Sequence, residues 1–502
     1  MKVGEIIRNL NNPGENLSQR AVRSGFWVFS LRIVQQLFSL ARLVILARIL
    51  APHDFGLLGI ALLTMATLET FSQTGFQAAL IQKKEDIKSH LDAAWTVLIL
   101  RGFILFAILY FIAPYAATFF NAPEAKPIIQ VIGFAILLQA FTNIGVIYFQ
   151  KELEFNKEFI YQFAGTLADF IVAVSAVLIL RNVWALVFGL LAGNFARFVV
   201  SYFIHPYRPH LSSDLGKAKE LFGFGKWILG SSILIFLLTQ GDDIFVGKLL
   251  GATALGFYQM AYRISNIPAT EITHVISQVT FPAYSKLQDN IPKLREAYLK
   301  VLQVTAFLSF PIAGLIFVLA PDFTKIFLGE KWMPMVPAMQ VLAIFGVTRA
   351  LNATNGPIFY ALGNPRIGTK ISFVQLIFLA IIIYPFTNVG KLIGISWAVT
   401  LANLLCFSMS FYSVLKYIPV KKLDMIYIFS FHTLSTLCSV LSVYFFKHLI
   451  STKLPSFSIF IISILIALAT YLGCSNILNL FFKQPVLGTY SLFKELFSGR
   501  KL

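Results

Sequence analysis

The chain has 502 residues, of which 57% are hydrophobic, 13% are charged and 50 are Phe, and this composition excludes a water-soluble globular protein. A formal net charge of +18 would suggest nucleic-acid binding in a soluble protein, but here the Lys and Arg residues lie between long apolar segments. The sequence therefore predicts an all-α polytopic membrane protein whose basic connectors face the cytoplasm.

Apolar runs of bilayer-spanning length predict about fourteen transmembrane helices. The helices are centred near residues 37, 68, 102, 138, 168, 194, 234, 265, 307, 347, 378, 403, 435 and 467. Most of the Lys and Arg residues lie in the termini and in every second connector, near 82–91, 151–158, 205–219, 284–300, 363–370 and 416–424. Both termini are therefore expected to be cytoplasmic, and the polar N-terminal segment, which lacks a signal-peptide pattern, is expected to be retained.

An internal repeat becomes visible when the chain is aligned with itself at a shift of 200 residues. The end of the first helix, ARILAPHDFG, then matches GKLLGATALG, with Leu50 on Leu250 and Gly56 on Gly256. Six helices precede the repeat, so the halves share one orientation and are related by a pseudo-two-fold axis along the membrane normal. We expect six-helix lobes at 1–210 and 211–420, an extra helix pair at 421–482 and a basic cytoplasmic tail at 483–502.

The first helix carries a polar stripe within its apolar span. Arg32, Gln35, Ser39 and Arg42 follow one another at spacings of 3, 4 and 3, which places them on one helical face. Charges inside a membrane normally face a bundle interior or a water-filled cavity, so the stripe predicts a cationic cavity suited to a phosphate-bearing substrate. The alternative is snorkelling toward the headgroups, which is what we expect of Arg48 near the helix end.

The repeat places an acidic residue opposite one of these arginines. Asp242 is the mate of Arg42, and Asp243 and Lys248 follow it in TQGDDIFVGK. Opposite charges at equivalent heights on two lobes could pair and close the periplasmic side of the cavity. Alternatively, the aspartates pair within their own lobe, for example with Lys248, or bind a coupling cation.

Further polar residues lie in the second and eighth helices. Candidates for substrate contacts are Glu69, Gln73, Arg263 and Glu271. Glu69 and Glu271 are also candidates for proton or sodium sites; otherwise these two are satisfied partners between helices. His274 and Gln278 share the face of Glu271, and Pro268 is expected to bend the eighth helix. Structural pairs are the expected role of Asp92, Arg101 and Asp169, and a helix break is expected at Asn352, Asn355 and Pro357.

The sequence contains no phosphate loop, metal-ligand cluster or nucleophile elbow. Three cysteines, Cys406, Cys438 and Cys474, lie in apolar segments and are interpreted as packing residues. We therefore expect a transporter without a cofactor, driven by an ion or substrate gradient or by a downstream consuming step, and not an enzyme.

Several segments together resemble the polysaccharide-transporter branch, the Wzx-type oligosaccharide flippases, of the superfamily that also contains multidrug and toxic compound exporters. These segments are ARILAPHDFGLLGIA, GFQAALIQKKE, YFQKELEFNK, VWALVFG, YRPHL and GDDIFVGKLLGATALGFYQMAYR, followed by TFPAYSKLQ and ALGNPR. The resemblance implies two six-helix lobes around a V-shaped cavity that opens alternately to each side, with two further helices. It also implies flipping of undecaprenyl-pyrophosphate-linked oligosaccharide across a bacterial inner membrane for O-antigen, capsule or exopolysaccharide assembly, alongside polysaccharide polymerase and chain-length machinery.

Four other functions are open to a membrane protein of this kind. A drug or cation antiporter of the same fold would need an acidic cavity, whereas the first helix supplies arginines. A membrane glycosyltransferase or polymerase would expose a large polar loop, but no connector exceeds roughly twenty residues. A non-transporting scaffold would not need a charged interior, and a flippase for peptidoglycan precursors is the nearest competitor. The sequence leaves the sugar repeat, the coupling ion and the oligomeric state open.

Overall fold

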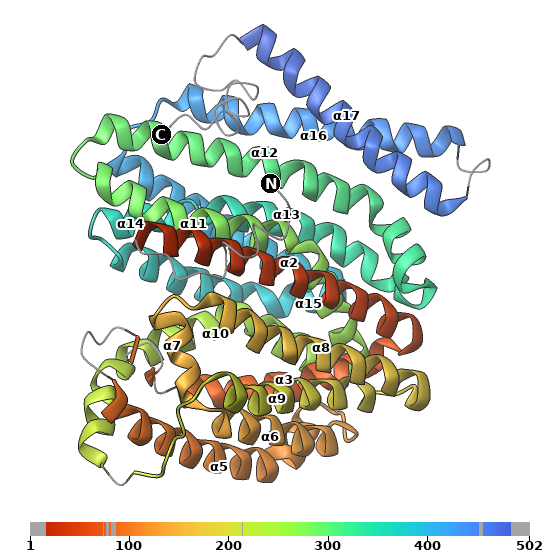
Figure 1. Ribbon diagram of the computed structural model, residues 1–502. Helices are drawn as coiled ribbons and strands as arrows, with labels where there is room; N and C mark the ends of the chain where they lie inside the picture. The colour runs from red at the N-terminus through yellow and green to blue at the C-terminus, as the bar shows by residue number, and fades with distance from the viewer. Residues whose placement is uncertain are drawn as a thin grey trace, which may run out of the picture. The chain divides into compact units, whose positions relative to one another are not determined.

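The computed structural model describes residues 17–73, 75–76, 80–81, 87–212, 214–450 and 455–482, and almost all of them are helical (Figure 1). Within the described residues, ten helices are long and apolar enough to cross a membrane, or eleven if one bent pair counts as a span. Long helices suit this environment because they satisfy their backbone hydrogen bonds internally, where no water is present to do so. The expected polytopic all-α membrane fold is confirmed.

The chain forms two compact units, Met1–Gly256 and Phe257–Leu502. The first unit contains α2 (Leu17–Ile49), α3 (Pro52–Phe71), α5 (Lys88–Phe119), α6 (Ala125–Phe141), η1 (Ile144–Val146), α7 (Ile147–Lys151), α8 (Phe155–Leu180), α9 (Trp184–Ile204) and most of α10 (Leu215–Ser265). Within this unit α8 packs against both α2 and α9, and α6 packs against α3, α5 and α9.

The second unit begins near the end of α10. It contains α11 (Ile267–Leu287), α12 (Ile291–Phe323), the π-helical turn η2 (Thr324–Leu328), η3 (Glu330–Met335), α13 (Val336–Asn352), α14 (Gly356–Ala361), α15 (Arg366–Tyr417), α16 (Lys422–Ile450) and α17 (Ser456–Phe482). The helices α12, α13 and α15 pack against one another in sequence, with α11 alongside α12 and α13.

The count of fourteen spans is confirmed once the breaks inside long helices are considered. Gly251 interrupts α10 with φ 85° and ψ 177°, and Lys391 interrupts α15 with φ 46° and ψ −124°. Each of these two helices therefore contains two segments that count as separate spans. The second segment of α10 forms one span together with α11. The bent pair of α6 with η1 and α7, which turns by 69°, supplies the fourth span.

Helix breaks also occur where proline and asparagine predicted them. The tenth span is interrupted between Asn352, where α13 ends, and Gly356, where α14 begins. The eighth is interrupted at Asn266, between α10 and α11, so that Pro268 occupies the first turn of α11. Proline is tolerated there because the first N–H groups of a helix have no intrahelical partner.

The repeat is visible in the placement of the first helix junction of each half. In the first half α2 ends at Ile49 and α3 begins at Pro52, and in the second half the break of α10 falls at Gly251. These positions are equivalent at the shift of 200 residues. The lobe boundary at 210/211 stays a prediction.

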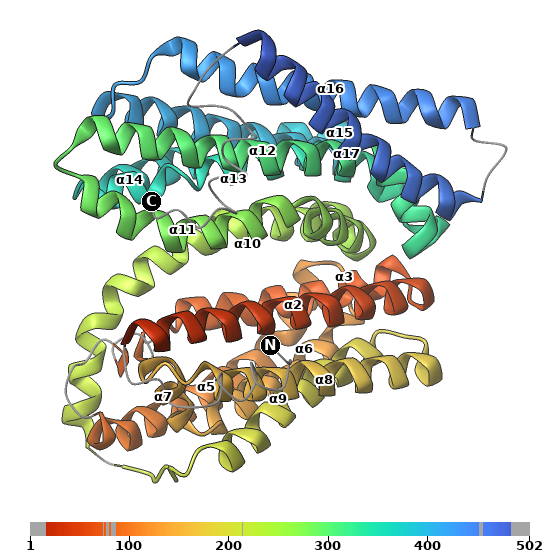
Figure 2. The same cartoon turned by 45° about the horizontal axis from the view of Figure 1, so that its top comes forward.

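Each unit has an apolar core between its helices. In the first unit Leu46, Leu50, Val177 and Leu186 are buried together where α2, α8 and α9 meet. In the second unit the core lies between α11, α12, α14, α15 and α16. Figure 2 shows the C-terminal pair α16 and α17 crossing, and both helices pack against α12.

Candidate functional site

The polar stripe of α2 is turned toward protein. Arg32, Gln35, Ser39 and Arg42 are all half-buried. The opposite face of the same helix exposes large apolar side chains: Phe29, Ile33, Leu37 and Leu40. A span that exposes apolar groups and shelters its charges has the polarity expected in a membrane.

Arg42 forms an ion pair inside the first unit. Its Nε lies 3.0 Å from Oδ2 of Asp169 on α8, and the two side chains are 21% and 25% exposed. Asp169, expected to belong to a structural pair, therefore neutralises one charge of the stripe across the α2–α8 interface. The gate expected between Arg42 and Asp242 stays a prediction.

Arg101 of α5 caps the C-terminal end of α3. Its Nε donates to the carbonyl oxygen of Ser72 at 2.9 Å, and one terminal nitrogen donates to the carbonyl of Glu69 at 3.1 Å and to Oγ of Ser72 at 2.9 Å. The last carbonyls of a helix lack intrahelical donors, and a cation complements the negative end of the helix dipole. Arg101 lies thirteen residues into α5, about 20 Å from its start, so this cap is inside the span His90–Phe119.

The end of α3 changes the neighbourhood of two candidate residues. The helix stops at Phe71, so Glu69 lies in its last turn, while Gln73 follows the helix end and is exposed. The hydroxyl of Ser72 also donates to the carbonyl of Leu68 at 2.7 Å, which competes with helix continuation.

The acidic candidates of α10 are sheltered, and its lysine has a defined partner. Asp242 is 3% exposed, and Asp243 is half-buried. Lys248 donates from Nζ to the carbonyl oxygen of Phe119 at 2.7 Å and lies 4.8 Å from the centre of the Phe119 ring. Lys248 therefore caps the C-terminal end of α5, a role that its sequence neighbours did not indicate.

The remaining candidates come from the eighth span. Arg263 is exposed in the last turn of α10. Glu271, His274 and Gln278 lie on α11, at positions where the side chains fall outside the described part of the chain. Their predicted roles stay predictions.

The connector between α9 and α10 is held by side-chain contacts that were not predicted from the sequence. Asp92 of α5 accepts through Oδ1 from the hydroxyl of Tyr207 at 2.6 Å and from the backbone N–H of His210 at 2.8 Å. Asn143 donates to the carbonyl of Tyr207 at 2.7 Å. The segment 205–211, which ends in YRPHL, is therefore a strap that ties the connector between α9 and α10 to α5.

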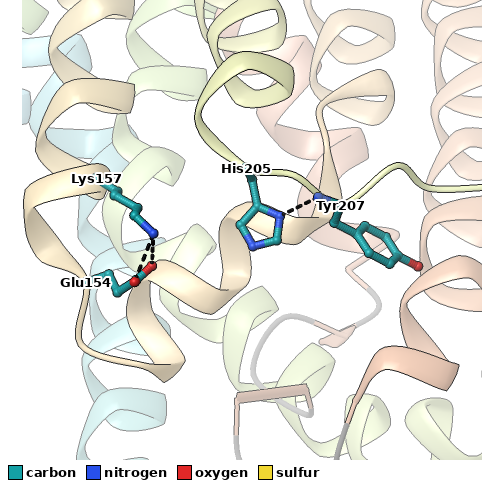
Figure 3. Close-up of polar contacts among 4 residues, drawn as sticks. All are labelled: Glu154, Lys157, His205 and Tyr207. Carbon is teal, nitrogen blue, oxygen red and sulfur yellow. Dashed lines mark hydrogen bonds and ion pairs between the residues drawn. The ribbon is translucent and has the colours of Figure 1, made fainter.

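The strap begins at His205, which Figure 3 shows between Tyr207 and the ion pair of Lys157 with Glu154. Nδ1 of His205 accepts from the N–H of Tyr207 at 3.1 Å, and its ring is stacked on Tyr148. Burial and the nearby Lys157 lower the pKa of His205. Burial and the hydrogen bond to Asp92 raise the pKa of Tyr207. The strap is thus built around a neutral imidazole and a protonated phenol.

Several arginines lie within the spans of the first unit. Among them, Arg42 pairs with Asp169 and Arg101 caps α3, and guanidinium groups suit bidentate contacts with phosphate. Among the described residues, no group of three or more His, Cys, Asp or Glu side chains could hold a metal ion.

Known proteins that are similar to this chain are named for polysaccharide biosynthesis. A family model described as "Polysaccharide biosynthesis protein" matches residues 45–337, which is more than half of the chain. The lipopolysaccharide biosynthesis protein WzxC of Escherichia coli (strain K12) is 26% identical over 404 residues, covering 80% of this chain and 82% of that protein. The teichuronic acid biosynthesis protein TuaB of Bacillus subtilis (strain 168) is 27% identical over 336 residues, covering 66% of this chain and 69% of that protein.

Among solved structures, the inward closed conformation of the lipid II flippase MurJ matches with a TM-score of 0.73 at 15% identity, covering 92% of this chain and 100% of that one. An inward-facing multidrug resistance MATE family transporter of the MOP superfamily matches with a TM-score of 0.59 at 17% identity, covering 77% of this chain and 96% of that one. The fold is therefore that of the MOP superfamily.

Proposed function

The chain belongs to the polysaccharide biosynthesis protein family, and from that premise we propose that it is a membrane transporter that flips lipid-linked oligosaccharide between leaflets. The observation that carries the proposal is the family match over 45–337, which includes parts of both predicted repeats. Relatives named for lipopolysaccharide, teichuronic acid and succinoglycan biosynthesis support a polysaccharide precursor as the cargo.

The charges of the first unit support the proposed substrate class. A lipid-linked oligosaccharide that carries undecaprenyl pyrophosphate presents two phosphates beside a long apolar chain, and arginines can meet phosphates with paired N–H donors. We assign pyrophosphate contacts to Arg32 and Arg42. Sugar contacts are assigned to the polar candidates Gln35, Glu69, Gln73, Arg263 and Glu271.

Movement between leaflets requires that the binding residues become accessible from each side in turn. We assign this alternation to the two repeats, with Arg42, Asp242, Asp243 and Lys248 as gate or ion-coupling residues. Glu69 and Glu271 are the candidates for coupling to a proton or sodium gradient. The location is the bacterial inner membrane with both termini cytoplasmic, and the partners are the polymerase and chain-length machinery of the same pathway.

The test is the leaflet distribution of lipid-linked glycans in cells that lack this chain, read with an impermeant probe at the periplasmic face. We expect intermediates to accumulate in the cytoplasmic leaflet and to return outward when the gene is restored. Analysis of the accumulated lipid would distinguish a polysaccharide precursor from a peptidoglycan precursor. A different result would support an antiporter instead of a flippase: an unchanged glycan distribution, together with cation efflux that is lost in cells without the chain and returns when the gene is restored.

A further inference from the structure

The most symmetric contact in the first unit joins the beginnings of two equivalent helices. Gly56 of α3 lies against the backbone of Ala252 so closely that an added Cβ would overlap the Ala252 carbonyl oxygen. An added Cβ on Gly256 would likewise overlap the carbonyl oxygen of Pro52. A shift of 200 residues turns the first contact into the second, because Pro52 is the mate of Ala252 and Gly56 is the mate of Gly256.

A third contact lies near the pseudo-two-fold axis that relates the two repeats. Nδ1 of His53 and Oγ1 of Thr253 are hydrogen-bonded at 3.3 Å, and these residues are 200 positions apart. A contact between a residue and its own repeat mate must lie near the pseudo-two-fold axis. His53 is half-buried and Thr253 is exposed, whereas Pro52, Gly56, Ala252 and Gly256 are buried, so the polar pair forms the rim of a backbone-to-backbone crossing.

Glycine makes this approach possible. Small residues let helix backbones come close in a membrane, where van der Waals packing contributes to association without help from a hydrophobic driving force. Here the atoms that meet the glycines are carbonyl oxygens and not the flexible ends of side chains. A methyl group at either glycine must therefore push the two backbones apart.

We propose that this crossing is the closure of the transport pathway on the side of the helix junctions, and that Gly56 and Gly256 are the positioning residues that determine how tightly it closes. The inference rests on the proposed function, because closure matters only for a chain that opens alternately to two sides. Lys248 supports the same location, since it ties α10 to the end of α5 just before the crossing. By the distribution of basic connectors this is the periplasmic side.

The first experiment measures the contact without any substrate. His53→Cys and Thr253→Cys are combined in the full chain with Cys406, Cys438 and Cys474 replaced by Ala, and the disulfide formed under mild oxidation in membranes is quantified by mass spectrometry. We expect efficient linkage in the parent. Adding Gly56→Ala or Gly256→Ala should lower the yield by about five-fold or more, because overpacking of this kind costs of order 1 kcal/mol or more.

The matched control is Gly230→Ala on the same helix α10, where an added Cβ meets no atom within 4 Å. Its yield should equal that of the parent. Equal yields in all three glycine variants would overturn the role of the crossing glycines.

The second experiment does not depend on the glycine variants folding. The doubly substituted chain is assayed for glycan flipping before oxidation, after oxidation and after reduction, and oxidation is expected to stop flipping reversibly. Full flipping by the linked chain would overturn the closure while leaving the proposed function intact. A chain that links as expected but has no effect on any lipid-linked glycan would instead overturn the proposed function.

Discussion

Two stretches that are related by the repeat, residues 32–56 and 232–256, have the same backbone arrangement but carry different charges. Both end in a break between helices and then in a glycine that touches the other stretch. Along the helices, however, Arg32 is replaced by Ser232 and Arg42 by Asp242. Backbone geometry is therefore shared by the two halves, whereas the intramembrane charge is assigned differently to each.

The two junctions are also made by different chemistry. In the first, Pro52 begins α3, and Asp54 accepts the backbone N–H of Ala51 at 2.9 Å. In the second, Gly251 adopts φ 85° and ψ 177°, a combination that only glycine adopts readily. Because different residues produce an equivalent junction, the turn itself is the shared requirement, and the polar residues around it are free to serve each half separately.

The largest effect is expected from removing the charges that only the first stretch carries. Arg32→Ala combined with Arg42→Ala should abolish surface glycan display, because the pathway would lose its phosphate-binding cations. Asp169→Asn is included in the same chain so that no carboxylate loses its partner. Display is measured by glycan electrophoresis, and membrane abundance by immunoblot.

The control for that experiment is Arg48→Ala, which removes an exposed arginine from the end of the same helix. It should leave display unchanged. Normal display in the charge-depleted chain would show that the cations of α2 do not bind the substrate.

The next effect separates a structural pair from a gate. Arg42→Asp should reduce both abundance and display, since a second carboxylate would then face Asp169, where Arg42 now forms the 3.0 Å ion pair. Adding Asp169→Arg should restore abundance, because it rebuilds the α2–α8 pair in the opposite direction. Adding Asp242→Arg or Asp243→Arg should restore display only if the gate between the repeats exists. Failure of both gate rescues, with abundance restored by Asp169→Arg, would remove the gate and leave Arg42 with its structural pair and its proposed phosphate contact.

A smaller effect is expected at the cap of α3, which has no counterpart among the charges compared above. Arg101→Gln should lower the stability of the folded chain by about 3 kcal/mol, because hydrogen bonds from a charged donor to the Glu69 and Ser72 carbonyls would be lost. Thermal unfolding of the detergent-solubilised chain measures the change. Arg101→Lys retains the charge but not the planar guanidinium group. Its unfolding midpoint should lie between those of the parent and of Arg101→Gln. An unchanged unfolding midpoint in Arg101→Gln would mean that water replaces the cap.

The sequence predicted the spans because their signal is long and local. Apolar length and prolines such as Pro268 depend on neighbouring residues, and the repeat register can be found by aligning the chain with itself; the structure agrees with all three. The partners of the charges could not be predicted in the same way. Asp169 is 127 positions from Arg42, and periodicity places a side chain on a face without saying which helix packs there.

The end of α3 shows a second limit. The polar residues Ser72, Gln73 and Thr74 and then Gly75 follow Phe71, so the local sequence does mark the stop. The local sequence does not show which group satisfies the carbonyls that the break leaves open, because Arg101 comes from another helix. The crossing at Gly56 and Gly256 had a signal in the repeat, since both glycines align, but alignment alone does not show that the mates touch.

The smallest effect is a pH dependence at the strap, far along the chain from the crossing. Because the pKa of His205 is lowered from its ordinary value of 6.5, the folded chain binds fewer protons than the unfolded chain just below that pH. The stability that neutral His205 contributes is therefore present above 6.5 and is lost as the pH falls through the lowered value. Protonation would place a hydrogen on Nδ1, which now accepts from Tyr207, and Lys157 and Arg208 oppose the added charge while Glu154 favours it.

The measurement is the unfolding midpoint of the solubilised chain at about pH 7.5 and about pH 5.5, a range in which histidine titrates. The parent should lose more stability on acidification than His205→Gln, which cannot titrate. Tyr207→Phe is the matched control, because it removes the hydroxyl bound to Asp92 but keeps the N–H that His205 accepts. It should lower the midpoint at both pH values and keep the parent's pH dependence. Equal losses of stability in the parent and in His205→Gln would assign the acid sensitivity to other groups and would show that His205 does not make the strap sensitive to pH.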